Sequence, residues 1–449
     1  MNWPAYPAYT ESTTAELGDI PQEWQPARLR HHVKLNPTAP PEVRAAGATV
    51  VPFLPMEAIG EDWSLDLSRS RPVEDLLTGY TYFEDGDVLF AKVTPCFENG
   101  KGALINELPT GHGFGTSEVT TIRPTMALSQ QFIGYLVQSN RFKQSGVGAM
   151  TGAGGLKRVP DEFVRNFWVG IPSAAEQHTI VNFLNHETEK LDALIGKHEQ
   201  LIVTLREDRT ATVTRAVTKG INPNVELKES GVEWLGAIPV HWSVDRLKHS
   251  VESARNGIWG SDPDGSEDDI RCVRVADFDR PQLAIHDRSI TFRKISASER
   301  NGRLLRRGNL LLEKSGGGDR NPVGFVVVYD SDTPAVCSNF VARVVLSPGQ
   351  HPKFWTYVHH CLYTSRLTYP SIKQNTGIQN LDQQSYLDER AGFPPSQEQA
   401  EIVDFLDDRC TKIDALIAKA AEVIETLREY RAALITDAVT GKIDVRGAA

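Results

Sequence analysis

Polar, glycine-rich loops stand at matching places in the two halves of this chain. The segment 92–101 follows a short apolar run and contains Lys, Thr, Glu, Asn and Gly, and the segment 313–321 follows a similar run with a similar composition. In the major groove, Lys or Arg reads guanine, Asn or Gln reads adenine, and Glu accepts from cytosine. Ser, Thr, Lys and backbone amides hold phosphates. These residue types therefore predict sequence-specific DNA binding.

The residues that we expect to contact DNA lie in these loops and in nearby polar stretches. In the first half they are Lys92, Thr94, Phe97, Glu98, Asn99, Lys101, Thr116, Ser117, Lys157 and Arg158. In the second half they are Arg255, Trp259, Lys314, Ser315, Gly316, Gly317, Arg320, Asn321, Ser338, Asn339, Lys373, Gln374 and Thr376. Ordinary solvent-exposed loops are the alternative interpretation, and the matched placement in both halves favours DNA contact.

The sequence lacks the common patterns of catalysis. No Walker A pattern, H-E-x-x-H, G-x-S-x-G or Asn/Asp-Pro-Pro-aromatic methyltransferase motif occurs. The acidic cluster 262–269 resembles a solvated loop more than a pair of catalytic carboxylates. The run 315–318 could cradle a phosphate through its backbone amides. We therefore expect a non-catalytic protein without a metal site, and a nuclease that cleaves DNA alone with Mg²⁺ is the enzymatic alternative.

A tandem repeat must position the two sets of loops. Segment 180–207 returns at 402–429 with a shift of 222, and the pattern Leu-Gly-x-Ile-Pro-x-x-Trp-x-x-x-Arg-Leu at 17–29 returns at 235–247 with a shift of 218. Between these anchors the two halves differ almost completely. A duplicated frame with two unlike inserts predicts one scaffold that presents two different recognition surfaces.

Two segments have the seven-residue periodicity of helices that pack lengthwise. Their seam positions are Leu184, Leu191, His198 and Leu205 in the first and Leu406, Ile413, Ala420, Leu427 and Leu434 in the second. Apolar pairs beside the seam, such as 194–195 and 416–417, predict a companion row. About 44 residues at roughly 1.5 Å each predict a rod of about 65 Å.

The ends of both helices carry recognisable signals. Ser173 with Glu176 and Ser396 with Gln399 predict capping boxes, and a glycine after each segment predicts a C-cap. The matching registers favour an antiparallel pair within one chain, although self-association or a generic coiled coil is the alternative. His198 is expected to be a polar seam position rather than a metal ligand.

The two inserts, at about 22–172 and 240–393, are expected to contain both helices and strands. Each has the size of one α+β domain. We expect strands at 88–91, 310–312, 325–329 and 341–345, where short apolar or β-branched runs are bounded by turn residues. Helical pieces are expected at 129–145 and 352–367.

The length and composition are those of an ordinary globular protein. The chain has 449 residues, of which 40% are hydrophobic, and a net charge of −10, so two or more domains are expected. The negative charge lies mainly in the repeated frame and tail, which leaves the inserts close to neutral. No apolar run of membrane-spanning length and no signal peptide are visible, and the five cysteines are scattered. A cytoplasmic protein is the simplest expectation.

Taken together, the motifs resemble those of type I restriction–modification specificity subunits. The resemblance covers nearly the whole chain and is carried by the segments 86–101, 228–242, 311–318, 376–381 and by the helix openings 171–177 and 393–399. It implies an α+β fold with two tandem target-recognition domains separated by two long antiparallel coiled-coil helices, in a pseudo-twofold arrangement.

The resemblance also implies how the chain is divided and what it works with. The first recognition domain would span 1–172 with an arm at 1–20, the first spacer helix 173–220, the linker and second recognition domain 221–393, and the second spacer helix and tail 394–449. Each domain would read one half of a bipartite, asymmetric site in double-stranded DNA. Two methyltransferase subunits would dock on the chain, restriction/translocation subunits would join them, and S-adenosylmethionine, ATP and Mg²⁺ would belong to those partners.

Two further alternatives stay open at this point. One is the specificity subunit of a related methylation or phage-defence system that lacks the restriction subunit. The other is a protein-interaction scaffold without sequence preference, which would assemble with partners but bind all DNA alike.

Overall fold

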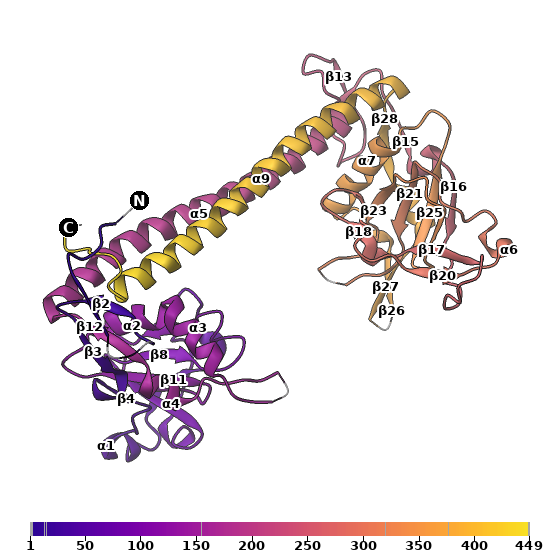
Figure 1. The fold of residues 1–449 in the computed structure, drawn as a ribbon. Helices are drawn as coiled ribbons and strands as arrows, with labels where there is room; N and C mark the ends of the chain where they lie inside the picture. Colours follow the sequence, from indigo (N-terminus) through magenta and orange to yellow (C-terminus); the bar gives the residue numbers. More distant parts are fainter. Residues whose placement is uncertain are drawn as a thin grey trace. The chain divides into compact units, whose positions relative to one another are not determined.

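The chain folds into helices and short-stranded sheets (Figure 1). The computed structural model describes residues 3–447 except 13, 15, 154, 319 and 376. Its internal contacts divide it into two compact units. Unit 1 comprises residues 1–199 and 421–449, and unit 2 comprises residues 200–420. No helix in the described part of the chain combines the length and the apolar character needed to cross a bilayer.

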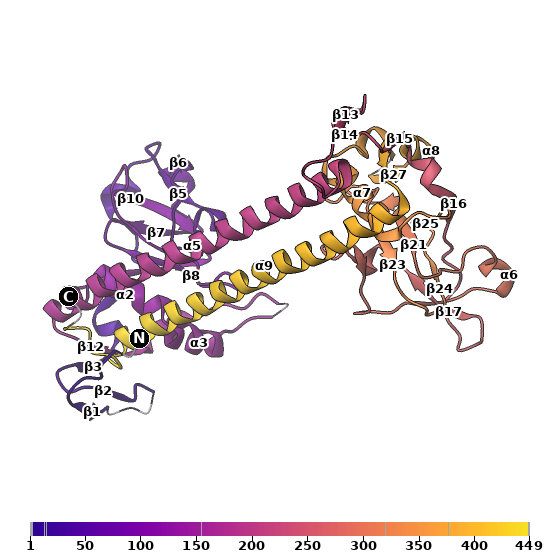
Figure 2. The same cartoon turned by 90° about the horizontal axis from the view of Figure 1, so that it is seen from above.

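Two long helices, α5 (Ala174–Lys219) and α9 (Ser396–Val439), contribute to both units. In unit 1 the beginning of α5 lies beside the end of α9, where Leu184 and Leu434 share one core. In unit 2 the end of α5 lies beside the beginning of α9, where Val213 and Leu406 share another (Figure 2). Because the start of each helix pairs with the end of the other, the helices are antiparallel, as the heptads predicted.

The heptad positions differ in burial. Leu184, Leu191, Leu406, Ile413, Ala420 and Leu434 are buried, whereas His198, Leu205 and Leu427 are half-buried. The expected companion row is wrong in part, because Leu194, Leu201 and Leu416 are exposed. Neighbouring residues on a helix point about 100° apart, so that one of each apolar pair faces away from the partner helix.

The helix ends only partly follow the predicted capping boxes. The Ser173 hydroxyl accepts from the Glu176 amide at 3.3 Å, but Glu176 accepts from the Tyr6 hydroxyl at 2.8 Å. Helix α9 begins at Ser396 itself, which makes the predicted box there wrong. Gln399 instead donates to the Pro394 carbonyl at 3.0 Å. The expected glycine caps are present, because Gly220 and Gly441 have φ of +70° and +73°.

Unit 1 holds two four-stranded sheets, β6-β5-β10-β7 and β4-β11-β8-β9, with short helices packed beside them. Its strands are β1 (Tyr9–Glu11), β2 (Asp19–Pro21), β3 (Gln25–Arg28), β4 (Val33–Leu35), β5 (Val50–Leu54), β6 (Ser70–Pro72), β7 (Tyr80–Glu84), β8 (Val88–Ala91), β9 (Gly102–Leu104), β10 (His112–Thr116), β11 (Val119–Pro124) and β12 (Trp168–Ile171). Its short helices are α1 (Pro41–Arg44), α2 (Gln130–Gln138), α3 (Asn140–Ala149) and α4 (Asp161–Asn166).

Unit 2 is built around the sheets β16-β25-β21-β23, β20-β17-β24 and β22-β27-β26. Its strands are β13 (Leu227–Glu229), β14 (Ala237–Pro239), β15 (Ser243–Arg246), β16 (Val251–Asn256), β17 (Asp269–Val273), β18 (Phe278–Asp279), β19 (Ala284–Ile285), β20 (Phe292–Lys294), β21 (Asn309–Glu313), β22 (Ser315–Gly316), β23 (Val326–Tyr329), β24 (Ala335–Cys337), β25 (Val341–Leu346), β26 (Ile372–Asn375), β27 (Ile378–Leu381) and β28 (Arg390–Phe393). Its short helices are α6 (Ala297–Arg300), α7 (Pro352–Thr364) and α8 (Gln383–Leu387).

The four expected strands are confirmed as β8, β21, β23 and β25, but the two helical pieces need correction. The piece at 129–145 is two helices, because the Ser139 hydroxyl accepts from the Phe142 amide at 3.2 Å and caps α3. The piece at 352–367 ends at Thr364, and Arg366 follows with φ of +59°.

The repeated frame packs in the same way in each unit. Strand β3 pairs with β12 beside the buried Trp24, and β15 pairs with β28 beside the buried Trp242. A Cβ added to Gly170 or to Gly392 would lie 2.9 Å from the tryptophan ring of its own unit. The tryptophan and the glycine are therefore one packing motif that occurs twice.

Candidate nucleic-acid interface and helix junctions

In unit 2, four of the predicted segments meet at one end of the main sheet. Lys314 follows β21, and its ammonium donates to the Asn256 amide oxygen at 2.8 Å, at the end of β16. The amides of Lys314 and Ser315 both donate to the Phe340 carbonyl, at 2.8 and 3.2 Å. The Ser315 hydroxyl donates to the Asn380 amide oxygen at 2.6 Å, on β27. The polar loops of this half therefore form one continuous surface.

The glycines of this surface allow a tight turn. Gly316 and Gly317 have φ of +120° and +35°, and a Cβ on Gly317 would lie 2.8 Å from the Val323 amide. Arg320 and Asn321 are exposed beyond this turn. On the neighbouring hairpin, Lys373 pairs with Asp382 at 2.7 Å and Gln374 is exposed. Thr376, also expected to contact DNA, lies outside the described residues.

A mainly apolar cavity of about 470 Å³ opens beside the surface. It is lined by Trp259, Arg274, Val275, Ala276, Ser338, Asn339 and Phe340. Trp259 and Phe340 are 38% and 45% exposed, and the Arg293 guanidinium lies 4.6 Å from the Trp259 ring centre. Ser338 is buried, so this predicted contact residue presents little surface. Phe340 was not among the expected contacts, although it directly follows the predicted pair Ser338 and Asn339.

In unit 1, the predicted segments meet around the start of the 92–101 loop. The Lys92 amide donates to the Glu118 carbonyl at 2.8 Å, and the Thr94 hydroxyl donates to the Lys157 carbonyl at 2.9 Å. Arg158 donates to both carboxylate oxygens of Glu118, at 2.8 and 2.7 Å. These hydrogen bonds hold the pKa of Glu118 below its usual value. Arg158 therefore has an internal anionic partner, which a phosphate would have to replace.

The rest of that loop turns toward the protein interior. Phe97 is 3% exposed and packs against Phe90 and Phe142, so its expected contact with DNA is wrong. The Lys101 ammonium donates to the Met56 carbonyl at 3.3 Å, and the Asn99 amide donates to Glu61 at 2.7 Å. These three side chains position the loop. Glu98 and Ser117 are exposed, whereas Thr116 is half-buried.

The junctions of the long helices with the short helices α2 and α7 use equivalent residues in the two units. In unit 1, the Tyr135 hydroxyl donates to Asn185 at 2.8 Å, and in unit 2 the Tyr357 hydroxyl donates to Asp407 at 2.8 Å. Both members of each pair differ by the repeat shift of 222. Between the helices, Arg431 pairs with Asp192 at 2.9 Å and Arg209 pairs with Asp414 at 3.1 Å, again at that shift.

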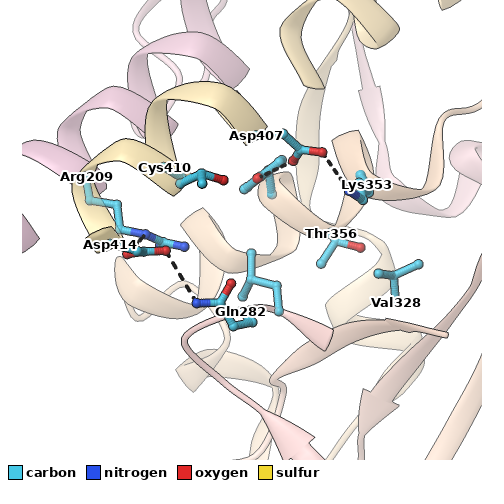
Figure 3. A pocket seen from close by; sticks show the side chains of 11 residues that line it. Arg209, Gln282, Val328, Lys353, Thr356, Asp407, Cys410 and Asp414 are labelled. Atoms are coloured by element: carbon cyan, nitrogen blue, oxygen red, sulfur yellow. Dashed lines mark hydrogen bonds and ion pairs between the residues drawn. The ribbon is translucent and has the colours of Figure 1, made fainter. Parts of the chain in front are cut away.

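The unit 2 junction encloses a cavity of about 190 Å³ (Figure 3). Figure 3 shows Asp407 of α9 facing α7, where it also pairs with Lys353 at 2.6 Å. Arg209 donates to the Pro281 carbonyl at 3.0 Å and so ties α5 to the loop after β18. This polar network ties the long helices to α7 and to the loop after β18.

The described residues contain no group of three metal-binding side chains. Burial raises the pKa of the Cys272, Cys337 and Cys361 thiols to about 12, which keeps them protonated at neutral pH. The surfaces described above therefore suit binding through hydrogen bonds and charge.

The chain is similar to several type I specificity subunits. It is 32% identical over 198 residues to the type I restriction enzyme EcoEI specificity subunit of Escherichia coli, a match that covers 42% of this chain and 32% of that protein. It is 31% identical to the EcoAI subunit of the same organism, with 42% and 33% covered. The chain thus matches about a third of the length of these relatives. The StySPI subunit of Salmonella potsdam is 22% identical over 329 residues, with 72% and 67% covered. No family model matches.

Solved structures share the fold. A chain from the structure described as "Structural basis underlying complex assembly and conformational transition of the type I R-M system" gives a TM-score of 0.73 at 18% identity, with 94% of this chain and 99% of that chain covered. The HsdS subunit from Thermoanaerobacter tengcongensis gives 0.55 at 18% identity, with 94% and 98% covered. The predicted fold class and the resemblance to type I specificity subunits are confirmed.

Proposed function

We propose, from this similarity to type I specificity subunits, that the chain is the DNA-specificity subunit of a type I restriction–modification complex. The observation that carries the proposal is the repeat itself: the helix junctions are equivalent in the two units, whereas the polar loops differ. The scaffold is the same in the two units, but each unit presents a different polar surface. This arrangement suits a protein that recognises two different half-sites of one DNA site.

Recognition in this proposal relies on the loop geometry of each unit. In unit 2, exposed amide and basic groups, such as Gln374 and Arg320, would reach base edges, while Lys314 and Ser315 would hold phosphates. Burial lowers the pKa of Lys314, yet its ammonium still has Asn256 as an internal acceptor. In unit 1, Lys92 and Arg158 would take the corresponding places.

The chemistry of modification would belong to partner subunits. We propose that methyltransferase subunits dock on the repeated frame and that restriction/translocation subunits join them. S-adenosylmethionine, ATP and Mg²⁺ would be bound there and not by this chain. The chain would supply selection of the site, and it would not itself be an enzyme.

The proposal is tested by sequencing genomic methylation at single-molecule resolution with and without this gene. The expected result is a two-part motif, split by a spacer of fixed length, that is methylated only when the gene is present. Replacing Lys314 and Ser315 by Ala should weaken modification of the site while leaving the complex assembled. A methylation pattern that does not depend on the gene would refute the proposal.

The spacer length offers a second test. Half-sites one helical turn of DNA apart lie about 34 Å from each other, and long helices can enforce such a distance. We expect that adding one helical turn after Gly196 in α5 and after Ala418 in α9 lengthens the preferred spacer. Methylation of a panel of sites with varied spacers measures this, and an unchanged preference would show that the helices do not set it.

A further inference from the structure

A cluster of arginines in unit 2 has no carboxylate partner among the residues that the structure describes. Arg255 on β16 and Arg343 on β25 are directly opposite each other in the antiparallel pair. Arg306 lies in the turn before β21, and its charge and that of Arg255 both act on Arg343. Among the described residues, no Asp or Glu forms an ion pair with any of the three.

Most of the neighbouring arginines are different. Of the nine arginines between residues 271 and 307, six pair with an aspartate or glutamate. Arg307, which directly follows Arg306, pairs with Asp330 and Asp332. Arg288 and Arg303 share with Arg306 the absence of an ion pair among the described residues, but most arginines of this segment have an acidic partner.

The cluster is held in place by backbone carbonyls. Arg343 donates to the Leu304 carbonyl at 2.6 Å, and Arg255 donates to the Asn301 carbonyl at 3.2 Å. The Arg343 Nε–H is buried, and no acceptor among the described residues reaches it. Burial, together with the charges of Arg306 and Arg255, lowers the pKa of Arg343. Like charges opposite each other on paired strands cost stability, as does an unpaired buried donor.

The cluster lies next to the candidate DNA interface along β16. Arg255 directly precedes Asn256, whose amide oxygen accepts from the Lys314 ammonium at 2.8 Å at the end of this strand. Because successive side chains of a strand point to opposite faces, Arg255 and Asn256 lie on opposite faces of the sheet near its edge. Guanidinium groups are planar and bind phosphate with paired N–H donors. Two such groups opposite each other on β16 and β25, with a third in the turn before β21, suit successive phosphates of one DNA strand better than a single small anion.

We propose that Arg255, Arg306 and Arg343 bind the phosphate backbone of DNA at the edge of the second recognition surface. This rests on the proposed function, and it adds residues that the loop motifs did not include, since only Arg255 was among the expected contacts. The cluster adds affinity and orientation, while the bases are read elsewhere on the surface.

Arg306 and Arg307 provide a matched pair of variants. We compare R306A and R307A in the full chain assembled with its methyltransferase subunits, measuring affinity for the methylated site across a series of salt concentrations. For R306A, the slope of log K against log salt should fall by about one, the value for one lost phosphate contact. For R307A the slope should stay as in the wild type. The motif that is methylated should be unchanged in both.

Thermal unfolding without DNA separates binding from a structural role. R306A should unfold at the wild-type temperature or above, because the substitution removes repulsion from Arg343. A lower unfolding temperature for R306A, with an unchanged salt slope, would overturn the proposal in favour of a structural role. Equal slopes for R306A and R307A would overturn it as well.

A small free anion, such as inorganic phosphate, is the alternative ligand of the arginine cluster. Inorganic phosphate that raises the unfolding temperature of the wild type but not of R306A, with no difference in their DNA salt slopes, would assign the cluster to a small anion and overturn the DNA contact. A wild-type complex without sequence-specific, salt-dependent binding would refute the proposed function itself, and this assignment with it.

Discussion

The two units use the same frame and differ in what the frame carries. The tyrosine that joins the short helix to the long one is Tyr135 in unit 1 and Tyr357 in unit 2, and each donates at 2.8 Å. The loop after β8 begins at Lys92 and the loop after β21 at Lys314, and each of these amides donates to an equivalent carbonyl, that of Glu118 or of Phe340. The side chains there differ, because Glu118 pairs with Arg158 whereas Phe340 is 45% exposed. The frame is constrained by packing, whereas the loops are free to differ with their targets.

The frame is not identical in every detail. Phe183 of unit 1 is buried under Trp3, with ring centres 4.7 Å apart, whereas its repeat equivalent Phe405 is 43% exposed. The Trp242 indole donates to Glu398 at 3.0 Å, while no acceptor among the described residues reaches the Trp24 indole. The repeat therefore preserves shape more strictly than it preserves hydrogen bonding.

The largest expected effect comes from removing the buried tryptophans. W24A and W242A should each lower the free energy of unfolding by about 3–5 kcal/mol, because each leaves a cavity between the strand pair and the helix ends. W242F should cost more than W24F, since only Trp242 loses a hydrogen bond. Chemical denaturation of the four variants measures these free energies. Equal losses of unfolding free energy in W24F and W242F would show that the Trp242 hydrogen bond does not contribute to stability.

Acid should weaken unit 2 more than unit 1. Burial lowers the pKa of His359 and His360 from 6.5 to about 4, and the equivalent positions in unit 1 are Val137 and Gln138. Above pH 6.5 both histidines are neutral whether folded or unfolded. As the pH falls from 6.5 toward about 4, the unfolded chain binds protons first, and unit 2 loses up to about 1.4 kcal/mol per pH unit for each histidine.

Hydrogen exchange followed by mass spectrometry resolves the two units across that pH range. H360Q should make the loss in unit 2 shallower, whereas H178Q, at an exposed position on α5, should leave it unchanged. Parallel losses in both units would contradict the assignment of the acid sensitivity to these two histidines.

Glycine substitutions test the shared packing motif. G170A and G392A should each destabilise by about 1–3 kcal/mol, because the new methyl group would press on a buried indole ring. G196A, on α5 with no atom near its added Cβ, should stabilise by about 0.5–1 kcal/mol. Thermal unfolding compares the three variants. If alanine were tolerated at only one of Gly170 and Gly392, the packing motif would not be equivalent in the two units.

The smallest expected effect distinguishes the two inter-helix ion pairs. The side chains of Arg209 and Asp414 are 14% and 28% exposed, whereas those of Arg431 and Asp192 are 28% and 54% exposed. D414N should therefore cost about 1–2 kcal/mol and D192N less than about 1 kcal/mol. Denaturant unfolding measures both, and the reverse order would show that solvent exposure does not decide their strength.

The sequence predicted the elements that depend on local patterns. Heptads predicted the paired helices because burial of one stripe must repeat with the helical turn, and β-branched runs predicted β23 and β25. Ser139 ended a helix that the apolar pattern would have continued, since a serine within a helix and a serine cap look alike in sequence. The capping role of Gln399 depends on the Pro394 carbonyl and could not be read from spacing alone.

The candidate site was predicted less completely, because its side chains find partners far away in the sequence. Phe97 lies in a polar loop, but Phe90 and Phe142 enclose it. The sequence around Arg158 gives no sign of its ion pair with Glu118, which lies in the turn between β10 and β11. Arg306 and Arg343 form a cluster with Arg255 only in the folded chain, because the three residues are far apart in the sequence. Such pairings depend on tertiary contacts that motif spacing does not encode.

The claim that one frame carries two independent recognition surfaces is tested most directly by a duplication. A chain in which residues 240–393 replace residues 22–172 would carry the second surface twice. Single-molecule sequencing of methylated DNA should then give a motif whose two parts are the same half-site, with the spacer nearly unchanged. An unaltered asymmetric motif from this folded, assembled chain would contradict the account.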